Sequence, residues 1–140
     1  MIQRKQTLWL LFALTSAILT FFFPFYSGDK YVREHIVPNG EFVADVSFPV
    51  FVLTLLTILC TTTAIGLYKN RKIQFRIGLL ALLFSILVIV FYFKDIKVHF
   101  SKGHLLLSSI FAFVVPVFIF LALRGIRRDE KLVKSLNKLR

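Results

Sequence analysis

The stretch Phe48–Phe93 constrains this chain most, because it consists of two apolar runs separated by a short basic break. Each run is close to the ~20 residues that an α-helix needs to cross a bilayer. The break, residues 69–76, carries four positive charges and no negative one. A loop of this kind is typical of the cytoplasmic turn of a transmembrane helical hairpin. The stretch therefore predicts a membrane protein.

Composition and hydropathy agree with a membrane protein. The chain has 140 residues, is 57% hydrophobic and has a mean hydropathy of +0.77, whereas soluble domains are about 45–50% apolar. Four apolar blocks predict spans at 7–26, 48–68, 77–93 and 105–123. The first block also resembles a secretory signal peptide, but its exit has no small-x-small cleavage pattern, so we interpret it as an uncleaved span. We expect a single membrane domain, an antiparallel bundle of four transmembrane helices.

The net charge of +11 is distributed unevenly along the chain. The amino terminus, the loop at 69–76 and the tail at 124–140 carry all of the excess, while the loops at 27–47 and 94–104 together hold five basic and five acidic residues. Basic residues favour the cytoplasmic side of a membrane. This pattern predicts a multi-pass protein of the bacterial inner membrane with both termini in the cytoplasm, and it favours anionic lipid rather than nucleic acid as a partner.

The loops predicted on the external side contain signals for strands. Residues Tyr31–Val37 and Glu41–Val46 are rich in β-branched and aromatic residues, and Asn39-Gly40 between them favours a tight turn. These features predict a small β-hairpin, with an irregular loop as the alternative. The alternation in Lys94–Phe100 suggests a third strand.

Small and hydroxylated residues recur at helical spacing in two of the predicted spans. Such residues let helices approach closely in lipid, so we expect these positions to mediate helix packing rather than to line a pathway. They are Thr54, Thr57, Thr61 and Ala64 in the second span, and Gly78, Ala81 and Ser85 in the third. In the fourth span, Pro116 predicts a kink.

The tail predicts a basic amphipathic helix. We expect it to lie on the cytoplasmic membrane surface, to be separated from the fourth span by a break near Gly125, and to begin at Asp129; the alternative is a solvated extension of the fourth span. The residues expected to contact anionic lipid or a partner subunit are Arg124, Arg127, Arg128, Lys131, Leu132, Lys134, Leu136 and Leu139.

Few residues suggest catalytic or metal chemistry. No Asp, Glu, Lys, Arg or His lies inside a predicted span, which disfavours an ion-coupled transporter. His35, His99 and His104 lie in the external loops, but their spacing matches no zinc motif. No nucleophile motif or phosphate-binding loop is present, so we expect neither an enzyme nor a cofactor. The seventeen phenylalanines leave open a groove for a lipid or quinone.

Three segments of the chain carry a resemblance to a known family. They are the opening MIQR, the basic loop Tyr68–Lys72 and, above all, the tail ALRGIRRDEKLVKSL. In these segments the sequence resembles a family of small bacterial four-helix membrane proteins classed as a domain of unknown function. The family pattern often has Asp where this chain has Asn137. The resemblance implies a four-span inner-membrane protein and supplies no activity, ligand or catalytic residue.

Three functions remain open from the sequence. The first is a non-catalytic accessory or scaffolding subunit of a larger inner-membrane complex, which would have other membrane-protein subunits as partners. The alternatives are a lipid- or quinone-binding membrane protein and a small channel or transporter. The small size and the lack of catalytic groups favour the first.

Overall fold

The computed structural model describes residues 3–32, 35–45, 47–68 and 70–138. In these ranges the chain forms four α-helices, three strands and one 3-10 turn. The helices are α1 (Gln3–Leu19), α2 (Phe48–Gly66), α3 (Arg71–His99) and α4 (Ile110–Lys138). The strands are β1 (Tyr26–Val32), β2 (His35–Phe42) and β3 (Phe100–Leu105), and the 3-10 turn η1 is Leu107–Ser109.

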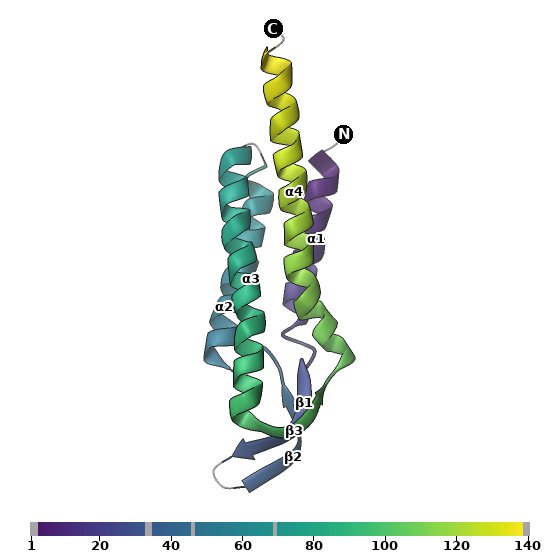
Figure 1. Cartoon of the computed structure of the whole chain (residues 1–140), viewed down its shortest axis with the longest axis vertical. Coiled ribbons are helices and arrows are strands. Elements are labelled where there is room, and N and C mark those ends of the chain that lie inside the picture. Colours follow the sequence, from purple (N-terminus) through teal and green to yellow (C-terminus); the bar gives the residue numbers. More distant parts are fainter. Residues whose placement is uncertain (1–2, 33–34, 46, 69, 139–140) are drawn as a thin grey trace.

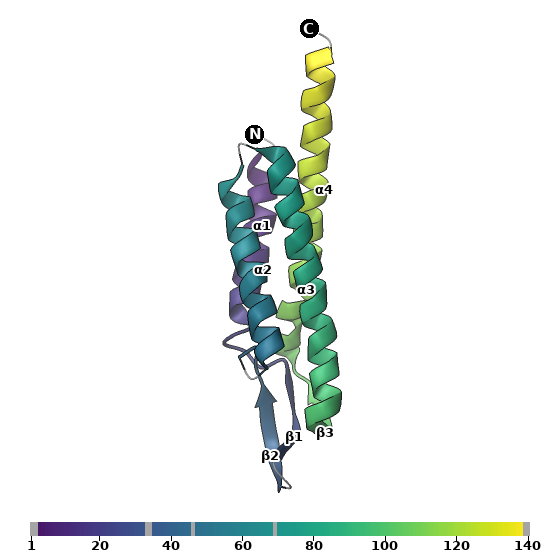
Figure 2. The same ribbon diagram turned by 90° about the vertical axis from the view of Figure 1, so that its left-hand side faces the viewer.

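The four helices run alongside one another and alternate in direction (Figures 1 and 2). Their main contacts follow the ring order α1–α2–α3–α4, and α4 returns to α1. The beginning of α1, the link between α2 and α3 and the end of α4 lie at one end of the bundle, here called the terminal end. The sheet lies at the other end, here called the sheet end. The mostly helical fold with a small antiparallel sheet is therefore confirmed.

Three helical segments of the described chain are long and apolar enough to cross a membrane, namely Phe48–Gly66, Arg71–His99 and Leu107–Val133. The apolar part of α1, Gln6–Leu19, is shorter. Within the predicted first span, 7–26, the helix ends at Leu19. Pro24 has no N–H and disfavours helical backbone in the residue before it, and the N–H of Phe25 instead donates to the carbonyl of Phe42 at 2.7 Å.

The sheet is antiparallel with the strand order β2-β1-β3. The predicted hairpin exists, but its turn was misplaced, because Val32 pairs with His35 and Asn39-Gly40 lie within β2. Gly28 pairs with Gly40, whereas Lys30 pairs with Val37, so the register shifts there and β2 has one residue more than β1 between the two pairs. A local Asn-Gly signal cannot distinguish a turn from such a bulge.

A row of three glycines crosses the sheet where Gly28 pairs with Gly40 on one side and with Gly103 on the other. A Cβ atom on Gly103 would lie 2.4 Å from the carbonyl oxygen of Ser27 and 2.6 Å from the Cα of Gly28. Both are backbone atoms that cannot rotate away. The close pairing of β1 with β3 therefore requires glycine at position 103.

The third strand was also misplaced, since Lys94–His99 continue helix α3 and β3 follows them. Helical continuation brings Ile96 against the buried cluster one turn beyond Tyr92. It also lets the hydroxyl of Ser47 donate to the carboxylate of Asp95. These tertiary contacts outweigh the local alternation that suggested a strand.

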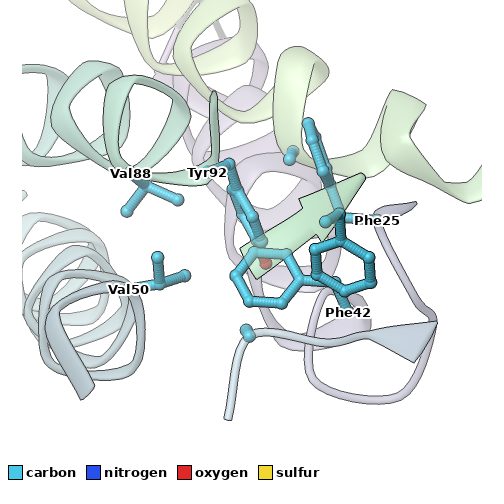
Figure 3. Packing of buried hydrophobic residues seen from close by; sticks show 8 residues of the cluster. Phe25, Phe42, Val50, Val88 and Tyr92 are labelled. Carbon is cyan, nitrogen blue, oxygen red and sulfur yellow. The ribbon is translucent and has the colours of Figure 1, made fainter. Parts of the chain in front are cut away.

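An aromatic cluster joins the sheet to the helices (Figure 3). The ring of Phe25 stacks on Tyr92 of α3 with centroids 4.1 Å apart, and Phe42 meets Tyr92 edge-on at 5.4 Å. Val50 and Val88 of α2 and α3 are buried in the same cluster. Because all of these side chains are buried, the cluster fixes the position of the sheet against the bundle.

Helix α4 is continuous from Ile110 to Lys138. The prediction of a separate tail helix that breaks near Gly125 and begins at Asp129 is therefore wrong, and the extension of the fourth span is the form observed. The reason is burial, since Ile126 and Asp129 face the bundle at 1% and 5% exposure. Pro116 lies inside α4, whose ribbon changes direction in its first part (Figure 1).

Candidate functional site

The described part of the chain has a groove of about 560 Å³ between α3 and α4, toward the terminal end. We call it the basic groove. One part of its lining is cationic and comes from a single face of α4: Arg124, Arg127, Arg128 and Lys131. These are four of the residues that the sequence predicted to contact lipid or a partner.

The remaining lining of the basic groove is apolar and comes from both helices. The residues are Phe75, Leu79 and Leu82 of α3, and Phe120 and Leu123 of α4. Leu123 is 4% exposed and forms the floor, whereas Leu79 and Phe120 are 44% and 56% exposed. Since α3 and α4 run in opposite directions, Leu82 and Phe120 lie toward the middle of the bundle and Lys131 lies toward its terminal end.

Aromatic contact holds one of the cations in place. The guanidinium carbon of Arg127 lies 4.6 Å from the centroid of the Phe75 ring. A guanidinium over an aromatic face is attracted by the ring quadrupole. Arg127 therefore links the basic and the apolar parts of the groove.

The α3–α4 contact beneath the groove depends on a small residue. A Cβ on Gly78 would lie 2.6 Å from the side chain of Leu123. The absence of a side chain at Gly78 therefore lets α4 approach α3 closely, as small residues do in membrane bundles.

A buried polar cluster on the other side of α4 joins three helices at the terminal end. The amide of Gln6 in α1 donates to the Oδ2 of Asp129, and the guanidinium of Arg71 at the start of α3 donates to the backbone carbonyl of Asp129 at 3.1 Å. Gln6 and Asp129 are 8% and 5% exposed. The other carboxylate oxygen, Oδ1, is buried without a hydrogen-bond partner among the described residues. The cluster sets the rotation of α4 and so turns its basic face toward the groove.

Sequence reasoning missed Gln6, Arg71 and Asp129 as a cluster, although a helical signal was present. Gln6 precedes the buried residues Leu10, Ala13 and Ala17 at spacings of four, three and four. Gln74 precedes Gly78 and Ala81 in the same way, and its amide donates to the carbonyl of Ala64 at 2.9 Å, near the end of α2. A polar residue in register with a small-residue stripe is therefore a signal for a buried hydrogen bond.

The seven residues predicted to mediate helix packing all lie on inward faces. Those of α2 are buried, as are those of α3. The hydroxyls of Thr54, Thr57 and Thr61 donate to carbonyls of their own helix. These internal bonds satisfy the buried hydroxyl groups. The seven are Thr54, Thr57, Thr61, Ala64, Gly78, Ala81 and Ser85.

The remaining predicted tail residues lie beyond the groove. Leu132 is 45% exposed on α4. Lys134 and Leu136 belong to α4, but their side chains are outside the described part of the structure, and Leu139 lies outside the described residues. The basic groove thus brings together four of the eight predicted contact residues.

The three histidines occupy different elements, with His35 in β2, His99 at the end of α3 and His104 in β3. Within residues 3–32, 35–45, 47–68 and 70–138, no group of three or more His, Cys, Asp or Glu side chains could hold a metal ion.

The fold defines a helical bundle with three segments long and apolar enough to cross a membrane and a cationic and apolar groove toward one end. The chain belongs to the family described as "Domain of unknown function (DUF4293)", whose model matches residues 2–139. This match confirms the resemblance seen in the sequence. No curated protein and no solved structure matches the chain.

Proposed function

We propose that this chain is a four-span protein of the bacterial inner membrane with both termini in the cytoplasm, and that it is a non-catalytic accessory subunit of a larger membrane assembly. The short α1 is compatible with a span, because its apolar part Gln6–Leu19 is followed by the apolar segment Thr20–Phe23, and the two together approach the roughly 17–25 residues of a span. The location of the basic loop and both chain ends at the terminal end supports the orientation.

A labelling experiment tests the orientation. Cys60 in α2 is a free cysteine and would first be replaced by alanine. Single cysteines are then introduced at Asn39 and Asn137, and intact cells and inverted vesicles are treated with a membrane-impermeant maleimide. We expect Asn39→Cys to be labelled in cells and Asn137→Cys only in inverted vesicles. Labelling of both from the same side would contradict the proposal.

The observation that carries the accessory role is the projection of α4 past the other helices (Figures 1 and 2). On this projecting part, Leu132 and Val133 are 45% and 42% exposed among basic residues. An exposed apolar pair on a rigid cationic helix suits an acidic, partly apolar surface on another subunit. The helix would hold that subunit at the cytoplasmic face.

Copurification in a mild detergent tests this role. We expect a stoichiometric partner to copurify with the unmodified chain and to be lost from the variant Leu132→Ser with Val133→Ser. Ser135→Ala is the control, because it changes an exposed side chain of the same segment without altering its charge or removing apolar surface. If the double variant retains the partner, or if none is found in stoichiometric amount, the accessory role is wrong.

A lipid- or quinone-binding role is the second candidate, and the basic groove favours it. The channel or transporter alternative has less support. A cavity among the described residues is lined by all four helices and has a volume of only about 10 Å³. This volume is the lower limit for a single water molecule. Its lining includes Ala17, Thr57, Ser85 and Val115.

A further inference from the structure

We propose that the basic groove binds one anionic phospholipid, whose phosphate lies against the arginines of α4 and one of whose acyl chains lies along the apolar lining. The inference rests on the proposed membrane location. It does not depend on the accessory role or on the identity of any partner subunit.

The order of residues along the groove matches the order of groups in a phospholipid. On α4 the lining changes from Phe120 and Leu123 to Arg124 within a single turn, and it stays basic as far as Lys131. The apolar lining of α3 ends at Phe75, beside the stacked guanidinium of Arg127. The groove is therefore apolar toward the bilayer and cationic toward the membrane surface. Its 560 Å³ fall within the range of about 300–1,000 Å³ for small-molecule sites.

The cations suit a phosphate group in both number and type. Three of the four are arginines, whose planar guanidinium binds phosphate oxygens in a bidentate manner. Asp129 does not oppose them, because its carboxylate is buried and bound by Gln6 on the opposite side of α4. Arg124 and Arg128 are exposed, so a ligand can reach them without a change in the fold.

The apolar lining distinguishes a phospholipid from free phosphate. An inorganic anion would use only the basic part, and the exposed surfaces of Leu79 and Phe120 would add nothing to its binding. An acyl chain would cover both residues. The cytoplasmic leaflet is rich in anionic lipid, which is the leaflet that the proposed orientation places beside the groove.

Native mass spectrometry of the full chain in a mild detergent measures the binding directly. Phosphatidylglycerol and phosphatidylcholine with the same acyl chains are added separately, and the fraction of chains that retain one lipid is recorded. We expect phosphatidylglycerol to bind at least about tenfold more tightly. Each juxtamembrane cation contributes roughly one kcal/mol, so Arg124→Gln with Arg128→Gln should weaken phosphatidylglycerol binding by about thirtyfold.

Two matched controls separate the groove from general charge and surface effects. Lys72→Gln with Arg76→Gln removes two exposed cations near the start of α3, outside the groove, and should change the affinity less than about threefold. Leu79→Trp fills the groove and should abolish retention, whereas Leu80→Trp places the same ring at a neighbouring position, 50% exposed, and should leave retention unchanged.

Four results would overturn the proposal. The first two are equal retention of phosphatidylglycerol and phosphatidylcholine, and an equal loss of phosphatidylglycerol affinity in the groove charge variant and in the control charge variant. The other two are retention of phosphatidylglycerol by Leu79→Trp, and displacement of the lipid by millimolar inorganic phosphate. Each concerns the purified chain alone. A failure of lipid binding therefore leaves the copurification result intact, and the two proposals fail separately.

Discussion

The hydrogen bond between Gln6 and Asp129 joins the first and last helices, and its contribution to stability can be measured. Both side chains are more than nine-tenths buried. Asp129→Ala removes the acceptor and leaves the Gln6 amide desolvated without its partner, which costs about 1–3 kcal/mol. The substitution keeps the β-carbon and removes only the carboxylate, so this lost hydrogen bond is the main cost. We therefore expect Asp129→Ala to lower the free energy of unfolding by about 1–3 kcal/mol.

A double-mutant cycle isolates the pair from these other effects. Gln6→Ala, Asp129→Ala and the double variant are unfolded by denaturant in mild detergent micelles, and their free energies are compared with that of the unmodified chain. We expect a coupling energy of about 1–2 kcal/mol between the two positions. A coupling energy below about 0.5 kcal/mol would refute the buried hydrogen bond.

The variant Asp129→Asn shows whether the charge or the acceptor matters. Asparagine keeps an oxygen for the Gln6 amide, and the bond from Arg71 goes to the backbone carbonyl, which the substitution does not alter. Since Oδ1 has no hydrogen-bond partner in the described part of the chain, loss of the charge removes a desolvation cost. We expect a change of less than about 1 kcal/mol in stability. A loss as large as that of Asp129→Ala would refute the reasoning and assign the effect to the charge.

Three further variants test the packing by thermal unfolding. Gly103→Ala should lower the free energy of unfolding by about 2 kcal/mol or more, because the added Cβ would meet backbone atoms. Gly66→Ala is the control and should not destabilise, since no atom lies within 4 Å of its added Cβ. Equal effects of the two variants would contradict the requirement for glycine at position 103. Tyr92→Phe should be neutral or stabilising, because the hydroxyl is buried with no hydrogen-bond partner among the described residues. A decrease of more than about 1 kcal/mol in the free energy of unfolding would contradict this and indicate that the hydroxyl has a partner. Thr61→Leu should overpack the buried face of α2 and lower the free energy of unfolding by about 1–3 kcal/mol. Thr62→Leu, on the exposed face of the same helix, should leave it unchanged.

The residue periodicity of the sequence was sufficient to identify helices and their inward faces. In α2 and α3, the small and hydroxylated residues recur at spacings of three and four, and the structure buries them. This follows from the 3.6-residue repeat, which is a local property of the chain. The four basic residues of the groove were predicted only as charges of a basic tail helix, and the structure shows that they share one face of α4.

The ends of the elements were decided by tertiary contacts. Asn39-Gly40 favours a turn in isolation, but in the sheet Gly40 pairs with Gly28 in the glycine row, and Asn39 lies where the register shifts. Lys94–His99 alternate like a strand, but the burial of Tyr92 and the packing of Ile96 keep α3 helical there. Local propensities differ by about 1 kcal/mol or less, so a few buried side chains outweigh them.

The position of Asp129 depended most on the tertiary structure. Its neighbours Arg127, Arg128 and Glu130 suggest a solvated helix start, and nothing local distinguishes it from a capping residue. Only the approach of α1, allowed by Gly125 against Gln6, supplies the amide that satisfies a buried carboxylate. The sequence by itself determined where the apolar helices lie along the chain and which helix faces are basic or apolar. Only the tertiary structure decided how those faces pair: α4 is anchored by Asp129 on one side and lines the basic groove on the other. The local sequence pattern does not encode this, because burial and hydrogen bonding depend on segments that are distant in the chain.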